Sequence, residues 1–117
     1  MYYFGTGWTR FKLKEVTSNS PKDSIDAEKL SRQILDPIFG VTDLKKDKRV
    51  KFIPAKNDLN KLVNSIDDGN EILFLLAPVT FKELRSVADA DEYMPPKSTY
   101  IEPKLRSGLT IFDISDE

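Results

Sequence analysis

The chain has 117 residues, a typical length for one domain, and its 39% of apolar residues is enough to form one hydrophobic core. The net charge of −1 lacks the basic excess of a nucleic-acid-binding domain. The absence of cysteine and histidine excludes disulfides, thiolate nucleophiles, zinc–thiolate sites and histidine acid–base chemistry. Any chemistry must therefore use carboxylates, lysines, hydroxyls or backbone amides.

No apolar run reaches the ~18 residues of a membrane-spanning helix. The N-terminus lacks the charged and apolar regions of a signal peptide, so we predict a cytoplasmic protein with no membrane contact. Residues 1–4 enter a strand pattern without a leader. We therefore expect residues 1–117 to form a single domain, the C-terminal fragment of a longer protein.

The first expected element is a β-hairpin, with strands at residues 2–4 and 8–14 and a loop at 5–7 that contains two glycines. Its aromatic side chains allow two interpretations. They form either a stacking platform for a ligand or, as we favour, core packing or a contact with a preceding domain. These residues are Tyr2, Tyr3, Trp8 and Phe11.

A polar linker at residues 16–22 precedes a predicted helix that ends near Pro37 and Gly40. Three residues are plausible N-caps of this helix: Asp23, Ser24 and Asp26. The helical spacing of four apolar residues predicts one apolar face, made of Leu30, Ile34, Leu35 and Ile38.

A charged loop then leads into a predicted short strand at residues 50–53, which Pro54 ends. Asn57 or Asp58 is expected to cap a second helix, and Gly69 to end it. Its apolar positions follow the helical period without a fault at Leu59, Leu62, Val63 and Ile66.

Six consecutive apolar residues at 72–77 indicate a strand covered on both faces, which we place at the centre of the sheet. Thr80 and Glu83 form a capping box for a third helix. Its apolar face is assigned to Phe81, Leu84, Val87 and Ala88. With further strands at 98–102 and 109–114, the pattern predicts an α+β fold (mixed α/β) with a five- to six-stranded mixed sheet and about three helices.

The loop at residues 94–109 gathers cations, hydroxyls and three stiffening prolines, which are the groups that an anion site needs. The candidate ligand-binding residues are Lys97, Ser98, Thr99, Glu102, Lys104, Arg106 and Ser107. The alternative is a solvated surface connector in which Glu102 pairs with a neighbouring cation.

A second basic loop contains Asp47, Lys48 and Arg49; it is either a phosphate-binding edge or a solvated loop. No aromatic residue interleaves its charges, which argues against nucleic-acid binding. The acidic residues Asp89, Asp91 and Glu92 lack calcium-loop spacing and indicate a solvated helix end, so no metal and no cofactor are predicted.

The stretch 94–109 (MPPKSTYIEPKLRSGL), with ILDPIFGV at 34–41 and DKRVKF at 47–52, resembles the C-terminal region of a bacterial and archaeal family catalogued as domain of unknown function 1015. The resemblance runs from about Trp8 to Phe112. It implies no activity, because the family has no established catalytic residues. Family members often resemble a Phe-Val-Gly-Gly pattern where this chain has Phe52, Ile53, Pro54 and Ala55, which puts a phosphate-cradling turn there in doubt.

Three functional hypotheses follow. In the first, an accessory domain completes a site for a small anionic metabolite or nucleotide with the 94–109 loop. In the second, a packing or interaction module binds the N-terminal part of its own protein or a second subunit and takes no ligand. In the third and least favoured, the domain is a nucleic-acid-binding regulator. The residues contain no identifiable acid–base pair, so we do not expect this chain to be catalytic by itself.

Overall fold

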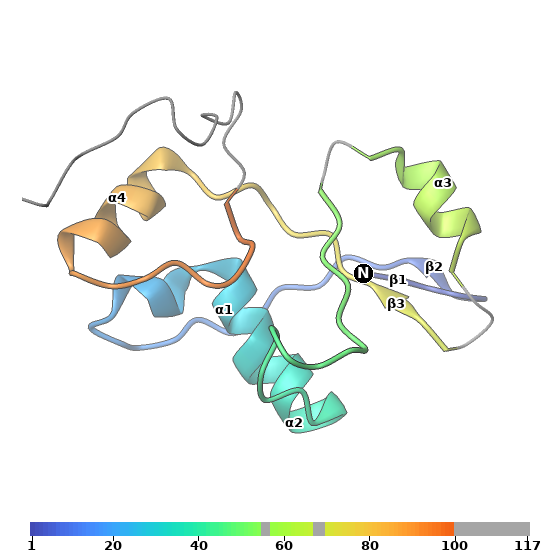
Figure 1. The fold of residues 1–117 in the computed structure, drawn as a ribbon, viewed down its shortest axis with the longest axis horizontal. Helices are drawn as coiled ribbons and strands as arrows, with labels where there is room; N and C mark the ends of the chain where they lie inside the picture. Colours follow the sequence, from blue (N-terminus) through green and yellow to red (C-terminus); the bar gives the residue numbers. More distant parts are fainter. Residues whose placement is uncertain (55–56, 67–69, 100–117) are drawn as a thin grey trace, which may run out of the picture.

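The computed structural model describes residues 1–54, 57–66 and 70–99. This part of the chain has an α+β fold with three separate helical segments, the first of which consists of several consecutive helical pieces, and one small antiparallel sheet of three strands (Figure 1). The α+β class is therefore confirmed. The prediction of five to six strands in a mixed sheet is wrong. The sheet has three strands, and both strand pairings are antiparallel.

The predicted N-terminal hairpin is confirmed. Strands β1 (Tyr2–Tyr3) and β2 (Gly7–Trp8) pair antiparallel, with Tyr2 opposite Trp8. In the turn the N–H of Thr6 donates to the carbonyl of Tyr3 at 3.2 Å. The Tyr2 and Trp8 rings meet edge to face, with centroids 5.4 Å apart. The second strand is much shorter than the predicted 8–14, because β1 supplies a pairing edge for only two residues.

Strand β3 (Ile72–Leu73) pairs with the other edge of β1, so the strand order is β2-β1-β3. The prediction that residues 72–77 form the central strand is wrong: β1 is central and β3 is an edge. The chain leaves the sheet after Leu73, and Leu75 is half exposed. The strand predicted at 50–53 is also wrong, because those residues pair with no strand and only Val50 among them is even partly buried.

The first helical segment changes helix type several times along its length. It comprises a 3-10 turn, η1 (Pro21–Ser24), then α1 (Asp26–Leu30), the π-helical η2 (Ser31–Leu35) and α2 (Asp36–Phe39). Ile25 precedes α1 without a side-chain cap, so the three predicted N-caps are wrong. The fixed φ of Pro21 starts η1 instead and draws Asp23 and Ser24 into that turn. The predicted end at Gly40 is confirmed, since Gly40 has φ +65°.

The two later helices begin where the capping residues predict. Asp58 caps α3 (Leu59–Asn64) by accepting the N–H of Asn60 at 2.9 Å. The capping box of α4 (Phe81–Asp89) is complete: Glu83 N–H donates to Thr80 Oγ1, and Thr80 N–H donates to Glu83 Oε2. The assignment of Phe81 to the buried face is wrong, because this side chain is 79% exposed while Val87 is buried.

The buried apolar side chains of the described residues all lie in one part of the molecule. Ile25, Leu30, Val41 and Val87 are buried, and they belong to or directly follow η1, α1, α2 and α4, which we call the helical half. The sheet and α3, which we call the sheet half, contain no buried residue within the described ranges. Figure 1 shows α3 and the sheet at one end of the molecule and η1 and α4 at the other.

The predicted strand at 109–114 and most of the one at 98–102 lie outside the described residues. Ser98 and Thr99, the described start of the first of these strands, are not in a strand. The prediction that the second helix ends at Gly69 is wrong, because α3 ends at Asn64 with Ser65 as its C-cap.

Candidate functional site: a groove in line with β1

A groove of about 730 Å³ begins where β1 begins. Its walls are residues 9–13, which follow β2, and residues 75–77, which follow β3. Figure 1 shows these two segments leaving the sheet near the N-terminus and diverging, the one after β2 towards α1 and the one after β3 towards α4. Because β1 lies between β2 and β3, the groove lies in line with β1. We call this hollow the β1 groove.

The β1 groove presents large apolar side chains to solvent. Trp8 is 49% exposed, Phe11 is 40% exposed and Leu75 is 49% exposed, and all three line the groove. Phe11 also meets Phe74 edge to face, with ring centroids 6.4 Å apart, so an aromatic contact joins the two walls. Exposed apolar side chains that gather in one hollow mark a binding surface more often than scattered ones do.

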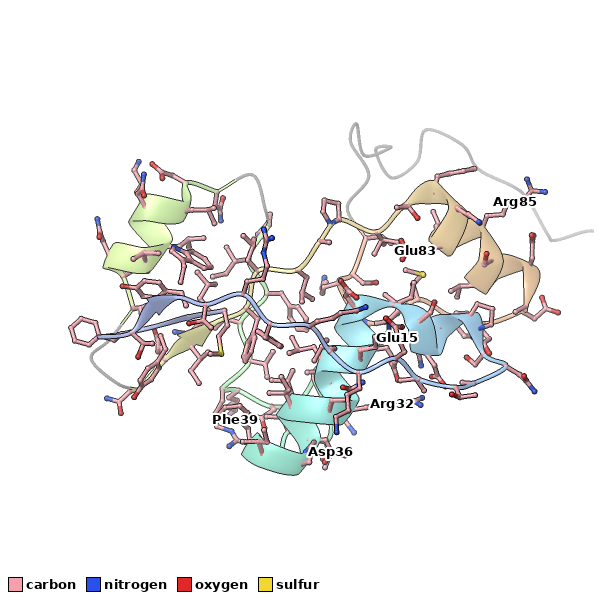
Figure 2. All side chains as sticks on the ribbon, turned by 180° about the vertical axis from the view of Figure 1, so that it is seen from behind. Glu15, Arg32, Asp36, Phe39, Glu83 and Arg85 are labelled. Carbon is pink, nitrogen blue, oxygen red and sulfur yellow. The ribbon has the colours of Figure 1, made fainter. Side chains whose placement is uncertain are left out.

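Charged side chains lie along one wall and at the far end of the groove. Arg10 and Lys12 are exposed on the wall that follows β2. At the end near α1, buried Lys29 donates to Glu15 at 3.0 Å (Figure 2), and this bond lowers the pKa of Glu15 below its ordinary value. Glu15 also pairs with Lys12 at 3.5 Å, so Lys29 and Lys12 are both paired, whereas the described residues offer no ion pair to Arg10.

The wall that follows β2 is held against the helical half by a side-chain amide. The N–H of Lys14 donates to Gln33 Oε1 at 2.9 Å, and Gln33 Nε2 donates to the carbonyl of Lys14 at 2.8 Å. One glutamine thus satisfies both main-chain groups of Lys14, as a neighbouring strand would. Together with the Lys29–Glu15 pair, these bonds fix where the groove ends.

The main chain of both walls lacks partners within the described part of the protein. Thr9 exchanges both hydrogen bonds with Met1, at 2.8 and 3.0 Å. Beyond this pair, residues 10–13 and 75–77 make no main-chain hydrogen bond to any described residue. The β1 groove therefore combines apolar side chains with two rows of unpaired N–H and C=O groups.

A smaller polar hollow of about 390 Å³ lies in the helical half, and several of its charged side chains make ion pairs or hydrogen bonds. Arg32, which Figure 2 labels, contacts Asp23 and Glu28, both at 2.8 Å. The hydroxyl of Ser20 donates to Glu92 at 2.7 Å, which ties the end of α4 to the start of η1. These contacts form a network that stabilises the helical half, which explains why charged side chains gather around this hollow.

The structure places only the first part of the predicted anion loop. Lys97 is exposed and has a left-handed φ of +56°. The Ser98 hydroxyl donates to the carbonyl of Pro95 at 2.7 Å, and Thr99 is exposed. Glu102, Lys104, Arg106 and Ser107 lie outside the described residues, so the anion site stays a prediction.

The second basic loop forms a clamp around the end of α2. Arg49 Nη2 contacts Asp47 Oδ2 at 2.6 Å, and Arg49 Nη1 donates to the carbonyl of Phe39 at 3.0 Å. The hydrogen bond from Arg49 lowers the pKa of Asp47 to about 2. Lys48 is exposed beside this clamp. Arg49 thus satisfies a carbonyl at the helix end and pairs with Asp47, while 64% of its side chain stays exposed.

No cluster of acidic side chains suited to a metal ion occurs among the described residues. The acidic residues near the end of α4 have other contacts: Asp89 pairs with Arg85 at 3.4 Å, and Glu92 accepts from Ser20. Nor does any helix in the described ranges have the length and apolar character to cross a membrane.

The β1 groove is not predicted by the residue pattern, although one signal points to it. The pattern predicted a second strand at 8–14 opposite a first strand at only 2–4. Such a mismatch leaves main-chain groups of the longer strand without a partner. The aromatic residues Trp8 and Phe11 were singled out for a contact, whereas Leu75 and Leu76 were assigned to a fully covered strand.

Comparisons with known proteins give no match to a family model, to a curated protein or to a solved structure.

Proposed function

We propose that this domain is an interaction module that binds a separate polypeptide in the β1 groove. The observation that supports the proposal best is the half-exposed set of Trp8, Phe11 and Leu75 within one hollow. Aromatic side chains are enriched at the centres of protein interfaces, where burial of their large surfaces dominates the binding energy. Arg10 and Lys12 supply a polar, charged rim to this apolar centre.

A polypeptide fits the groove better than a small anion does. The only buried cation of the groove, Lys29, is already paired with Glu15. Apolar side chains and main-chain groups line most of the remaining wall. A peptide offers partners for both kinds of group, whereas phosphate or sulfate would leave the apolar surface in water.

The single tryptophan of the chain, Trp8, lies in the groove and reports its occupancy directly. The experiment titrates the full chain with capped five-residue peptides of alternating apolar and polar residues. Trp8 fluorescence and two-dimensional amide spectra are followed. We expect saturable changes confined to residues 8–13 and 74–77. Inorganic phosphate and a DNA duplex, tested in parallel, should produce none.

Two phenylalanine variants provide the matched comparison. Phe11→Ala should weaken peptide binding about tenfold or more, because it removes a side chain that the peptide buries. Phe81→Ala removes an equally large side chain that is 79% exposed on α4 and does not line the groove, and should leave binding unchanged. Equal losses in the two variants, or no saturable binding of any peptide, would overturn the proposal.

A further inference from the structure

The groove wall that follows β2 is held by main-chain hydrogen bonds only at its two ends. At the sheet end, the N–H of Thr9 donates to the carbonyl of Met1 at 2.8 Å. At the other end, Lys14 exchanges two main-chain hydrogen bonds with the Gln33 side chain, at 2.9 and 2.8 Å. Residues 10–13 lie between these points and make no main-chain hydrogen bond to any described residue. The position of the wall therefore depends on what holds its ends.

Gln33 lies in the π-helical turn η2, and Pro37 gives this turn a physical cause. In a regular α-helix, the N–H of residue 37 would donate to the carbonyl of residue 33, but proline has no N–H and its ring crowds that carbonyl. The helix is wider here, and the N–H of Asp36 donates to the carbonyl of Ser31, five residues earlier. π-helical turns are rare and recur at functional sites. In this protein the residue at the centre of the turn, Gln33, contacts the groove wall.

Gln33 holds the wall without lining the groove. It is not among the residues around the hollow, so a bound ligand would not touch it. Its two bonds to Lys14 pair a donor and an acceptor on each side, as a hydrogen-bonded pair of antiparallel strands does, and so fix the direction of the main chain as well as its place. The neighbouring pair, Lys29 with Glu15, constrains the wall less, because the Glu15 side chain is 70% exposed.

We infer that Gln33 is a positioning residue of the β1 groove, which sets from the helical half where the wall at residues 10–13 stands relative to the wall at 75–77. The inference rests on the proposed function and assigns control of that site to a residue outside it. Without Gln33, the Met1–Thr9 bonds and the ring contact of Phe11 with Phe74 would hold the wall from the sheet half. A peptide would then have to order the wall as it binds, and this cost lowers the affinity.

The first test removes both hydrogen bonds with Gln33→Ala. It uses the full chain and the uncharged capped peptide acetyl-Gly-Val-Ser-Val-Gly-amide, with binding followed by Trp8 fluorescence and amide chemical shifts. We expect the variant to bind this peptide about fivefold more weakly or worse. Without peptide, the N–H of Lys14 should exchange with solvent faster in the variant. The amide shifts of residues 10–13 should change, whereas those of residues 75–77 should not.

The matched control is Arg32→Ala, a change at the adjacent residue of the same π-helical turn. Arg32 pairs with Asp23 and Glu28 in the helical half and makes no hydrogen bond to the wall within the described residues. Its loss should lower the thermal midpoint at least as much as Gln33→Ala does. Peptide affinity, measured at a temperature where both proteins are folded, should stay as in the unmodified protein. An equal loss of affinity in the two variants would overturn the inference, because any weakening of the helix would then suffice.

Gln33→Glu provides a second test in which the lost bond can be restored by pH. An ionised glutamate accepts the N–H of Lys14 but cannot donate to its carbonyl, whereas a protonated glutamate does both. Peptide affinity relative to the unmodified protein should therefore be low at pH 7. It should recover as the pH falls below about 4.3, the ordinary pKa of glutamate. The charged neighbours Lys14, Glu15 and Lys29 are the same in both proteins, so the ratio of the two affinities isolates residue 33.

The possible outcomes separate the inference from the proposed function. If the peptide binds the unmodified protein and both Gln33 variants equally well, the interaction module stands and the positioning role is refuted. A ratio of affinities for Gln33→Glu that stays constant from pH 7 to pH 3.5 refutes it as well. If the unmodified protein binds no peptide, the proposed function fails, and the inference that rests on it fails with it.

Discussion

The two halves of the molecule are stabilised in different ways. The helical half contains the buried Ile25, Leu30, Val41 and Val87, and α4 begins with a complete capping box. The sheet half has strands of two residues each and no buried residue within the described ranges. Its large apolar side chains, such as Trp8 and Leu75, are half exposed.

The difference indicates which half of the domain is the less stable. Helices satisfy their main-chain hydrogen bonds locally, so the helical half needs only a small core to hold its elements together. A sheet with such short strands is marginal without additional strands or a covering layer. The β1 groove, where we propose that a polypeptide binds, is lined largely by residues of this weaker half and the segments that leave it.

The largest expected effect comes from a matched pair of leucines, one in each half. Leu30 is buried and Leu75 is 49% exposed. Leu30→Ala should lower the free energy of unfolding by about 2–5 kcal/mol, because it leaves a cavity in the core. Leu75→Ala should lower it by less than about 1 kcal/mol. Denaturant unfolding followed by circular dichroism measures both, and equal losses would contradict the contrast between the halves.

A smaller effect is expected from the cap of α4. Thr80→Ala removes the hydroxyl that accepts the N–H of Glu83, and should lower the free energy of unfolding by about 1 kcal/mol. The control is Thr42→Ala, an exposed threonine outside any helix, which should change stability little. A Thr80→Ala protein as stable as the Thr42→Ala protein would show that local capping does not maintain the helical half.

The sequence predicted the helices better than the sheet because helix signals are local. Asp58, Thr80 and Gly40 act through contacts within one turn, and each lies at the helix end that its residue type predicted. The N-cap prediction failed at Asp23 and Asp26 because Pro21 starts a 3-10 turn earlier in the chain. Propensity at one residue was overridden by a neighbour with a fixed φ.

The sheet was mispredicted because strand pairing depends on residues far apart in sequence. The apolar run at 72–77 indicated a strand with two covered faces, but only Ile72 and Leu73 find a partner in β1. The candidate site was not predicted for the same reason, because its position depends on which strands pair. Phe11 and Leu75 could be identified as apolar, whereas their positions on opposite walls of one groove follow from the strand order.

The smallest effect is expected at the clamp on the end of α2, where the chain passes between the halves. Asp47 has a pKa of about 2, below its ordinary value of 3.8, because Arg49 donates hydrogen bonds to its carboxylate. A lowered pKa in the folded state means that the ionised pair stabilises the fold above about pH 4 and loses this contribution as the pH falls to about 2.

Asp47→Asn should therefore lower the thermal midpoint slightly at pH 6, and the gap to the unmodified protein should close by pH 2. Lys48→Ala is the control, because this exposed neighbour takes no part in the clamp. Melting curves across the pH range measure both variants. A difference in thermal midpoint that persists unchanged at pH 2 would mean that Asp47 acts through its shape and not through its charge. The carbonyl of Phe39, which Arg49 also contacts, would then be the group that holds the connector to the helical half.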